Sequence, residues 1–137
     1  MKTVAITGHF DPIHIGHVRH IQAASKLGLL MVIVNPDEHC IAKKGYCFMP
    51  YKERIEIIKA IRGVDQVVKN VDQDGTTAKS LETYKPDIFA KGGDRDESHM
   101  PQNELEVCKR LGIEIVYGVG GDKIQSSSRL VEKSKLK

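Results

Sequence analysis

Short runs of apolar residues alternate along the chain with longer stretches in which apolar residues recur every three or four positions. The short runs predict buried strands at residues 4–7, 29–34, 67–68, 87–90 and 113–117. The periodic stretches predict a helix after each of the first four strands and one after residue 117. Strands that alternate with helices are typical of a parallel sheet, so the pattern predicts an α/β domain.

Glycine and proline mark where several of these helices begin and end. Gly28 and Gly112 follow the last periodic residues of two helices, and Pro50 suits the first turn of another. Thr76 or Thr77 is expected to cap the short helix that runs to Tyr84.

Residues 35–49 show no sustained apolar period and contain the run Lys43-Lys44-Gly45. This predicts a mobile loop that is longer than most connections in compact domains. Long loops of this kind are usually functional or disordered, so we expect the lysine pair to have a role in ligand binding.

The composition restricts the class of protein. A chain of 137 residues that is 40% apolar can close one core, so we expect a single domain over residues 1–137. The net charge of +3 is spread along the chain, which argues against a dedicated nucleic-acid binder. The longest apolar run, at residues 29–34, is too short to cross a membrane and no signal peptide is visible, so we expect a cytoplasmic protein. The three cysteines contain no C-x-x-C pair, so we expect reduced thiols.

Residues 7–17, Thr-Gly-His-Phe-Asp-Pro-Ile-His-Ile-Gly-His, combine the end of a strand, a glycine turn and the start of a helix. In parallel sheets ligands bind beyond the carboxyl ends of the strands, and the amino end of a helix attracts phosphate. His14 and His17 share one helix face there, and two imidazoles can donate hydrogen bonds to phosphoryl oxygens as charge builds. Gly16 between them lets the backbone approach a ligand closely. The plainer alternative is a pair of helix-capping or core histidines.

This segment resembles the G-x-F-D-x-x-H-x-G-H motif of the H-x-G-H nucleotidyltransferases of the cytidylyltransferase type. Residues 51–54 resemble the E-R helix of that family, residues 61–65 its I-R-x-V-D block, and residues 126–130 its terminal S-T-T-x-I. Residues 91–94, Lys-Gly-Gly-Asp, are similar to the heptose-phosphate adenylyltransferase branch. The chain departs from the family at His9, where a small residue is usual, and at residues 120–123, which replace the R-T/A-E-G sequence of cytidylyltransferases.

The resemblance implies a single Rossmann-like, doubly wound α/β domain with a five-stranded parallel sheet. It implies an enzyme that transfers a nucleotidyl group from ATP or CTP to a small phosphorylated acceptor such as a sugar phosphate and releases pyrophosphate. Magnesium would accompany the nucleotide, and the enzyme would be a homodimer. Residues 91–94 and the missing cytidylyltransferase arginine favour ATP. A cytidylyltransferase acting on glycerol 3-phosphate or a similar phosphoalcohol is the alternative.

The resemblance also implies roles for individual residues. His14 and His17 would be catalytic, and Lys43 and Lys44 would close over the triphosphate. Arg54 and Arg62 would hold the acceptor phosphate. Magnesium would have no direct protein ligand, although Asp11 or Asp94 could reach it through water. The nucleotide would be bound by Gly8, His9, Phe10, Asp11, Gly16, Lys91, Gly93, Asp94, Ser126, Ser127 and Ser128.

Structural explanations stay open for several of these residues. The lysine pair can be solvated, Arg62 can complement a helix dipole, Asp11 and Asp94 can brace turns, and the serines can cap a helix. Two alternatives concern the whole site. His14, His17 and His20 recur every three residues and could hold zinc. The fold could also serve as a non-catalytic nucleotide-binding regulatory module.

Overall fold

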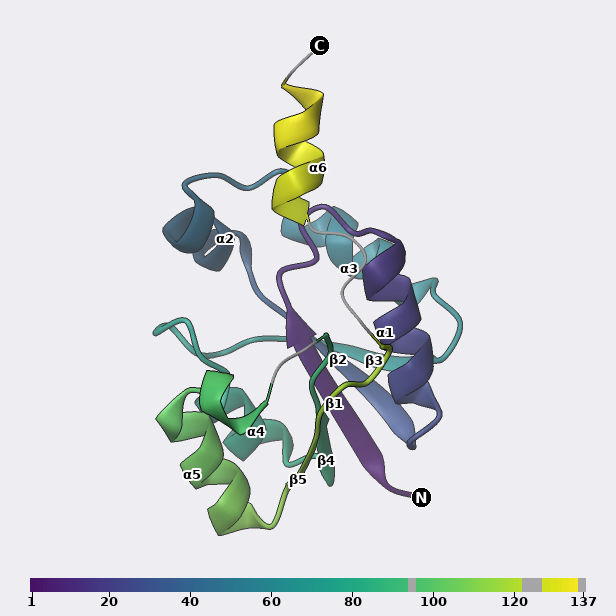
Figure 1. Ribbon diagram of the computed structural model, residues 1–137, viewed down its shortest axis with the longest axis vertical. Coiled ribbons are helices and arrows are strands. Elements are labelled where there is room, and N and C mark those ends of the chain that lie inside the picture. Colours follow the sequence, from purple (N-terminus) through teal and green to yellow (C-terminus); the bar gives the residue numbers. More distant parts are fainter. Residues whose placement is uncertain (94–95, 122–126, 136–137) are drawn as a thin grey trace.

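A parallel five-stranded sheet forms the centre of the protein in a computed structural model, which describes residues 1–93, 96–121 and 127–135 (Figure 1). The strands are β1 (Thr3–Gly8), β2 (Leu29–Val34), β3 (Val64–Lys69), β4 (Ile88–Ala90) and β5 (Glu114–Val116), and their order is β3-β2-β1-β4-β5. All four pairings are parallel, which confirms the predicted sheet. β1 is the central strand and pairs with β2 and β4.

Helices cover both faces of the sheet. α1 (Ile15–Ser25) and α3 (Tyr51–Lys59) pack on one face, and α4 (Ala78–Tyr84) and α5 (Gln102–Leu111) on the other (Figure 1). In β2 the side chains alternate between the two cores: Val32 joins the first face and Ile33 the second. Because both faces are buried, the strand appears in the sequence as one continuous apolar run. The predicted doubly wound α/β architecture is therefore confirmed.

Gly112 ends its helix as the sequence predicts, whereas Gly28 lies beyond the end of α1. Gly112 closes α5 in the left-handed conformation, with φ of 71°. A Cβ at Gly28 would lie 2.2 Å from the carbonyl oxygen of Lys2, so no side chain fits where α1 turns into β2. α1 itself ends at Ser25, and Leu27, which follows the helix, is exposed.

The prediction of a loop over residues 35–49 is wrong, because α2 (Asp37–Lys44) forms within it. Its first turn is acidic and its last turn carries Lys43 and Lys44, an order that complements the helix dipole. Only Cys40 of this helix is buried, so eight residues give no apolar period to detect.

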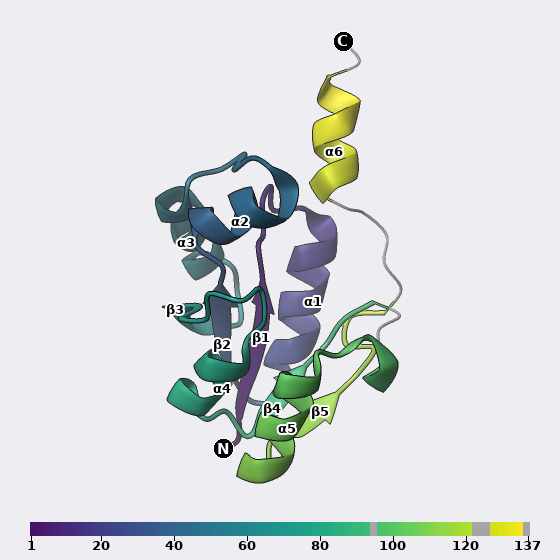
Figure 2. The same cartoon turned by 90° about the vertical axis from the view of Figure 1, so that its left-hand side faces the viewer.

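The last helix, α6 (Ser127–Ser134), lies beyond the carboxyl end of β1 and away from the sheet (Figure 2). Of the α6 residues whose exposure is described, Val131 is the buried one. A single-turn 3-10 helix, η1 (Glu97–His99), precedes α5. None of the helices in the described part of the chain is long and apolar enough to span a bilayer.

Candidate active site

The candidate site lies where β1 ends and α1 begins, at the centre of the sheet. β1 pairs with β2 on one side and with β4 on the other, so the chain order reverses here. In open α/β sheets, ligands bind beyond the strand ends at such a point. Gly8 ends the strand, and Phe10 is buried with φ of 53°. His14 is the N-cap of α1. The structure therefore gathers these residues at the carboxyl end of β1, and their binding of a nucleotide stays a prediction.

His14 and His17 form a stacked pair that is fixed by backbone hydrogen bonds. The N–H of Gly16 donates to Nδ1 of His14 at 3.0 Å, and the N–H of His14 donates to Nδ1 of His17 at 3.1 Å. The ring centroids are 3.8 Å apart at an interplanar angle of 21°, and Phe10 meets the His17 ring edge-on at 4.9 Å. Because each Nδ1 accepts, the proton of each neutral ring is on Nε2. The rings thus cap the helix and keep Nε2–H as a donor, so capping and phosphate binding are compatible.

His20 joins α1 to the far side of the site. Its Nδ1 contacts the carbonyl oxygen of Val119 at 2.8 Å. A Cβ at Gly92 would lie 2.9 Å from this ring, and one at Gly120 would lie 2.9 Å from the Cα atom of His20. The glycines therefore allow two loops to pack against the helix. Among the described residues, the three histidines of α1 form no metal-ligand cluster, so the structure does not support a histidine zinc site.

Lys44 reaches back from α2 to the loop after β1. Its Nζ donates to the carbonyl oxygen of Asp11 at 2.7 Å and lies 5.7 Å from the centre of the Tyr46 ring. Lys43, one residue earlier, has an exposed side chain. The two lysines thus differ: Lys44 braces the loop, whereas Lys43 is exposed, and contact of either with a triphosphate stays a prediction.

Asp11 is a fully buried carboxylate that holds the segment after α2. It accepts hydrogen bonds from the backbone N–H groups of Phe48 and Met49, and Nζ of Lys44 is 3.8 Å away. The bracing role is therefore present in the structure. A water-mediated contact with magnesium stays a prediction.

His9 is the residue at which this chain departs from the family motif. Burial, helped by the charges of Lys43, Lys44 and Arg54, lowers its pKa to about 4. Its Nδ1 lies 3.5 Å from Sγ of Cys40. At neutral pH the ring is uncharged, so it can contribute hydrogen bonds but no positive charge to the site.

Arg54 of α3 is buried beneath the site instead of facing it. Nε donates to the carbonyl oxygen of Met49 at 2.8 Å, and Nη1 donates to those of His9 at 2.7 Å and Asn35 at 2.6 Å. Nη2 pairs with Asp37 at 2.7 Å, and the Arg54 side chain is 0% exposed. The guanidinium therefore joins four segments, and its position does not support the predicted binding of an acceptor phosphate. Sequence reasoning missed Asp37, which serves both Arg54 and the amino end of α3.

Arg62 requires a correction. It lies just before β3, whose first residue pairs with Leu30 near the start of β2, whereas the site adjoins Val34 at the other end. Five strand residues separate these edges, which is about 16 Å. Arg62 is thus too far from the site to bind the acceptor phosphate. In the same block, Asp65 accepts the N–H of Leu30 at 2.8 Å, so this part of the motif is structural.

The remaining predicted residues come from β4 and the start of α6. Lys91 follows β4 and is buried, with Nζ 4.7 Å from the centre of the Phe89 ring. Gly93 follows it in the left-handed conformation. Ser127 donates to the carbonyl oxygen of Pro12 at 2.6 Å, which brings the start of α6 to the loop after β1. Asp94, Ser126 and the side chain of Ser128 lie outside the described part of the chain.

Comparison with known proteins decides the family. Residues 5–131 match the model of the family described as "Cytidylyltransferase-like". The chain belongs to this family. The predicted resemblance is confirmed, and so is the prediction of an enzyme of the nucleotidyltransferase class.

Several relatives are similar over most of the chain. The FAD synthase of Ferroglobus placidus is 37% identical over 82% of this chain and 72% of its own length. The bifunctional protein HldE of Citrifermentans bemidjiense is 35% identical over 96% of this chain, which spans only 27% of that protein. Among solved structures, the lipopolysaccharide core biosynthesis protein of Thermoplasma volcanium superposes with a TM-score of 0.70 at 26% identity, over 92% of this chain and 99% of its own. This cytidylyltransferase-like enzyme is thus similar to proteins of about its own size, and also to one part of the larger HldE protein.

Proposed function

We propose that this enzyme transfers the adenylyl group of ATP to the phosphate of a small phosphorylated acceptor and releases pyrophosphate. The observation that supports this most is the His14–His17 stack, in which each Nδ1 accepts a backbone N–H and each Nε2 keeps its proton. Two fixed donors at the amino end of a helix suit the charge that develops during phosphoryl transfer. Family membership argues against the alternative of a non-catalytic module.

The reaction needs no protein nucleophile. An oxygen of the acceptor phosphate attacks the α-phosphorus in line, the bond from that phosphorus to the oxygen bridging to the β-phosphorus breaks, and pyrophosphate leaves with the electron pair. His14 and His17 donate to the phosphoryl oxygens as their charge grows, and each donor contributes about 3 kcal/mol. Lys43 in the last turn of α2 adds a positive charge for the triphosphate. Catalysis is therefore positioning and charge stabilisation.

Magnesium neutralises the triphosphate when it is bound. The described residues provide no cluster of open carboxylates for it, and Asp11 is buried and accepts two N–H groups. Such an arrangement fits an ion carried chiefly by phosphate oxygens and water, as is usual for magnesium with nucleotides.

The choice of ATP and of acceptor rests on the residues at 91–94 and on the relatives. FAD consists of flavin mononucleotide joined to an adenylyl group through a pyrophosphate bridge, so an FAD synthase of this fold points to a phosphorylated flavin as one acceptor. The similarity of residues 91–94 to the heptose-phosphate adenylyltransferase branch points to a sugar phosphate as the other. Both acceptors present the same phosphoryl group to the histidine pair.

A pyrophosphate-release assay tests the proposal. ATP and CTP are each combined with magnesium and with flavin mononucleotide, sugar 1-phosphates, glycerol 3-phosphate or phosphoethanolamine. We expect release with ATP and one of the first two acceptor classes, and calorimetric binding of ATP at least ~10-fold tighter than that of CTP, or ~1.4 kcal/mol. Release with CTP and glycerol 3-phosphate would instead establish the cytidylyl alternative. If neither nucleotide bound, nucleotidyl transfer itself would be refuted. The expected homodimer stays a prediction, which the elution volume of the same protein tests.

A further inference from the structure

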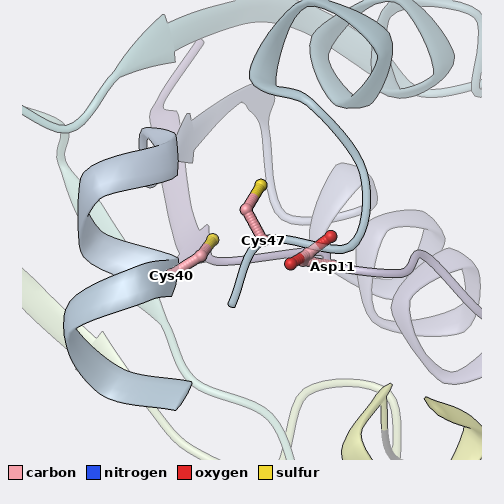
Figure 3. A group of neighbouring side chains, drawn as sticks. All are labelled: Asp11, Cys40 and Cys47. Atoms are coloured by element: carbon pink, nitrogen blue, oxygen red, sulfur yellow. The ribbon is translucent and has the colours of Figure 1, made fainter. Parts of the chain in front are cut away.

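Three side chains of metal-ligand type converge beside the site from separate segments of the chain. Cys40 comes from α2, Cys47 from the segment after it, and Asp11 from the loop after β1 (Figure 3). Their Sγ atoms and one carboxylate oxygen all lie within 4.8 Å of one another. Cys40 and Asp11 are 0% exposed, and Cys47 is partly buried. The proposed adenylyl transfer uses neither cysteine.

The donor set and its surroundings favour a particular kind of ion. Zinc and chemically similar divalent ions accept both sulfur and carboxylate ligands, whereas magnesium requires several oxygens and retains water. Bonds of about 2.3 Å to sulfur and 2.0 Å to oxygen place tetrahedral ligand atoms about 3.4–3.8 Å apart. Separations of at most 4.8 Å therefore need only small side-chain movements to reach this geometry.

The neighbouring groups supply the outer support that such a site needs. The N–H groups of Phe48 and Met49 hold the Asp11 carboxylate, which orients it while each oxygen keeps a lone pair. Two thiolates, one carboxylate and a divalent cation together carry one negative charge, which Nζ of Lys44 at 3.8 Å from the carboxylate offsets. His9, with Nδ1 at 3.5 Å from Sγ of Cys40, borders the fourth position, which it or a water molecule would fill.

We propose that Cys40, Cys47 and Asp11 bind one zinc-like divalent cation, distinct from the magnesium that accompanies the nucleotide. Binding replaces the proton of each thiol and releases two protons to solvent. The sulfur of Cys47, which now donates to Asp37 and to the carbonyl oxygen of Met49 at 3.1 Å each, turns to the cation instead. The ion joins α2, which carries Lys43, to the loop after β1.

The chain offers a matched control for the test. Cys108 is a buried free thiol on α5, in the core on the opposite face of the sheet, and has no place in the cluster. The full chain is reduced, treated with a chelator, dialysed, and titrated with cobalt(II) alone. The wild type and Cys108→Ser are compared with Cys40→Ser and Cys47→Ser. No nucleotide is present, so the result is independent of the proposed adenylyl transfer.

We expect one cobalt per chain in the wild type and in Cys108→Ser, with a sulfur-to-cobalt charge-transfer band that added zinc abolishes. Cys40→Ser and Cys47→Ser should bind at least ~100-fold more weakly and lose the band, because each lacks one of three ligands. X-ray absorption of the zinc-loaded wild type should count two sulfurs at about 2.3 Å, which needs no variant to fold.

Two results would overturn the proposal. One is a wild type without the band, or a band that survives in both cysteine variants. The other is the loss of two hydrogens from the wild type on treatment with peroxide, combined with no binding of cobalt to the reduced chain, which would make the pair a reversible disulfide.

Discussion

The backbone N–H of His14 donates to Nδ1 of His17 at 3.1 Å, across the first turn of α1. The bond closes a reciprocal cap, since Nδ1 of His14 in turn accepts the N–H of Gly16. Helix formation therefore sets the orientation and the tautomer of both rings before any ligand arrives. Pre-oriented donors lose little entropy when charge develops near them, which is the arrangement that phosphoryl transfer needs.

Replacing His17 by alanine should lower kcat by ~100-fold or more, because it removes a donor that acts in the transition state. Steady-state pyrophosphate release measures the effect, and circular dichroism checks that the fold is retained. His99→Ala is the matched histidine control, since His99 lies on η1 with 59% of its side chain exposed. A His17→Ala enzyme with nearly normal kcat would contradict the assignment.

Lys43→Ala and Lys44→Ala should differ. Lys44→Ala removes the bond to the Asp11 carbonyl oxygen at 2.7 Å, so we expect it to lower the free energy of unfolding by ~1–2 kcal/mol. Lys43→Ala should chiefly weaken magnesium–ATP binding and should lower the unfolding midpoint in urea less than Lys44→Ala does. Calorimetry measures the effect on nucleotide binding and urea titration the effect on stability. Lys109→Ala is the control, since Lys109 is an exposed lysine in the last turn of α5. Equal effects of both substitutions on both measurements would refute this distinction.

Arg54→Ala should destabilise the fold by roughly 3–5 kcal/mol, since it breaks the ion pair with Asp37 and removes a donor from each of three carbonyl oxygens. Arg54→Lys keeps the charge but not the planar set of donors, so it should recover only part of the loss. Urea unfolding is the measurement. A normal midpoint together with a raised KM for the acceptor would instead restore the phosphate-binding role.

Asp87 should make stability depend on pH in the acid range. The backbone N–H of Thr3 donates to its carboxylate at 2.8 Å and the Thr3 hydroxyl at 3.2 Å, and these bonds lower the pKa of Asp87 below its usual value. A carboxyl with a lower pKa in the folded state stabilises above the unfolded pKa of about 3.9, and this contribution disappears as the pH falls through the folded value. Asp87→Asn should therefore unfold at a lower temperature than wild type at pH 6, and the gap should close towards pH 2. A gap that does not change with pH would show that the carboxylate charge is unimportant.

The sheet was predictable because its physical cause is local. Val32 and Ile33 of β2 are buried on opposite faces of the sheet. The run of six apolar residues therefore indicates a strand that is buried on both faces. The histidine pair was predictable for a similar reason, since the spacing of His14 and His17 and the helix start are both visible in the sequence.

Other features depended on distant contacts that no spacing reveals. Arg54 sits in a helix whose sequence looks like that of a surface helix, and its burial follows from acceptors at His9, Asn35 and Asp37. Thr77 is the N-cap of α4 as expected, yet its side chain does not cap; its hydroxyl instead points to Thr7 at 3.4 Å. The predicted role of Arg62 was wrong because a sequence motif gives only the order of residues along the chain. It does not show at which edge of the sheet a residue lies.

The pairing of β1 on both sides has a consequence for how the site opens. Its backbone amides lie within the sheet and should exchange hydrogen with solvent only when the whole molecule unfolds. α2, with Cys40 as its one buried residue, should exchange far faster through local opening. The two halves of the site thus belong to cooperative units of different stability. A ligand can enter beside α2 at small free-energy cost while the histidine-bearing half keeps its geometry.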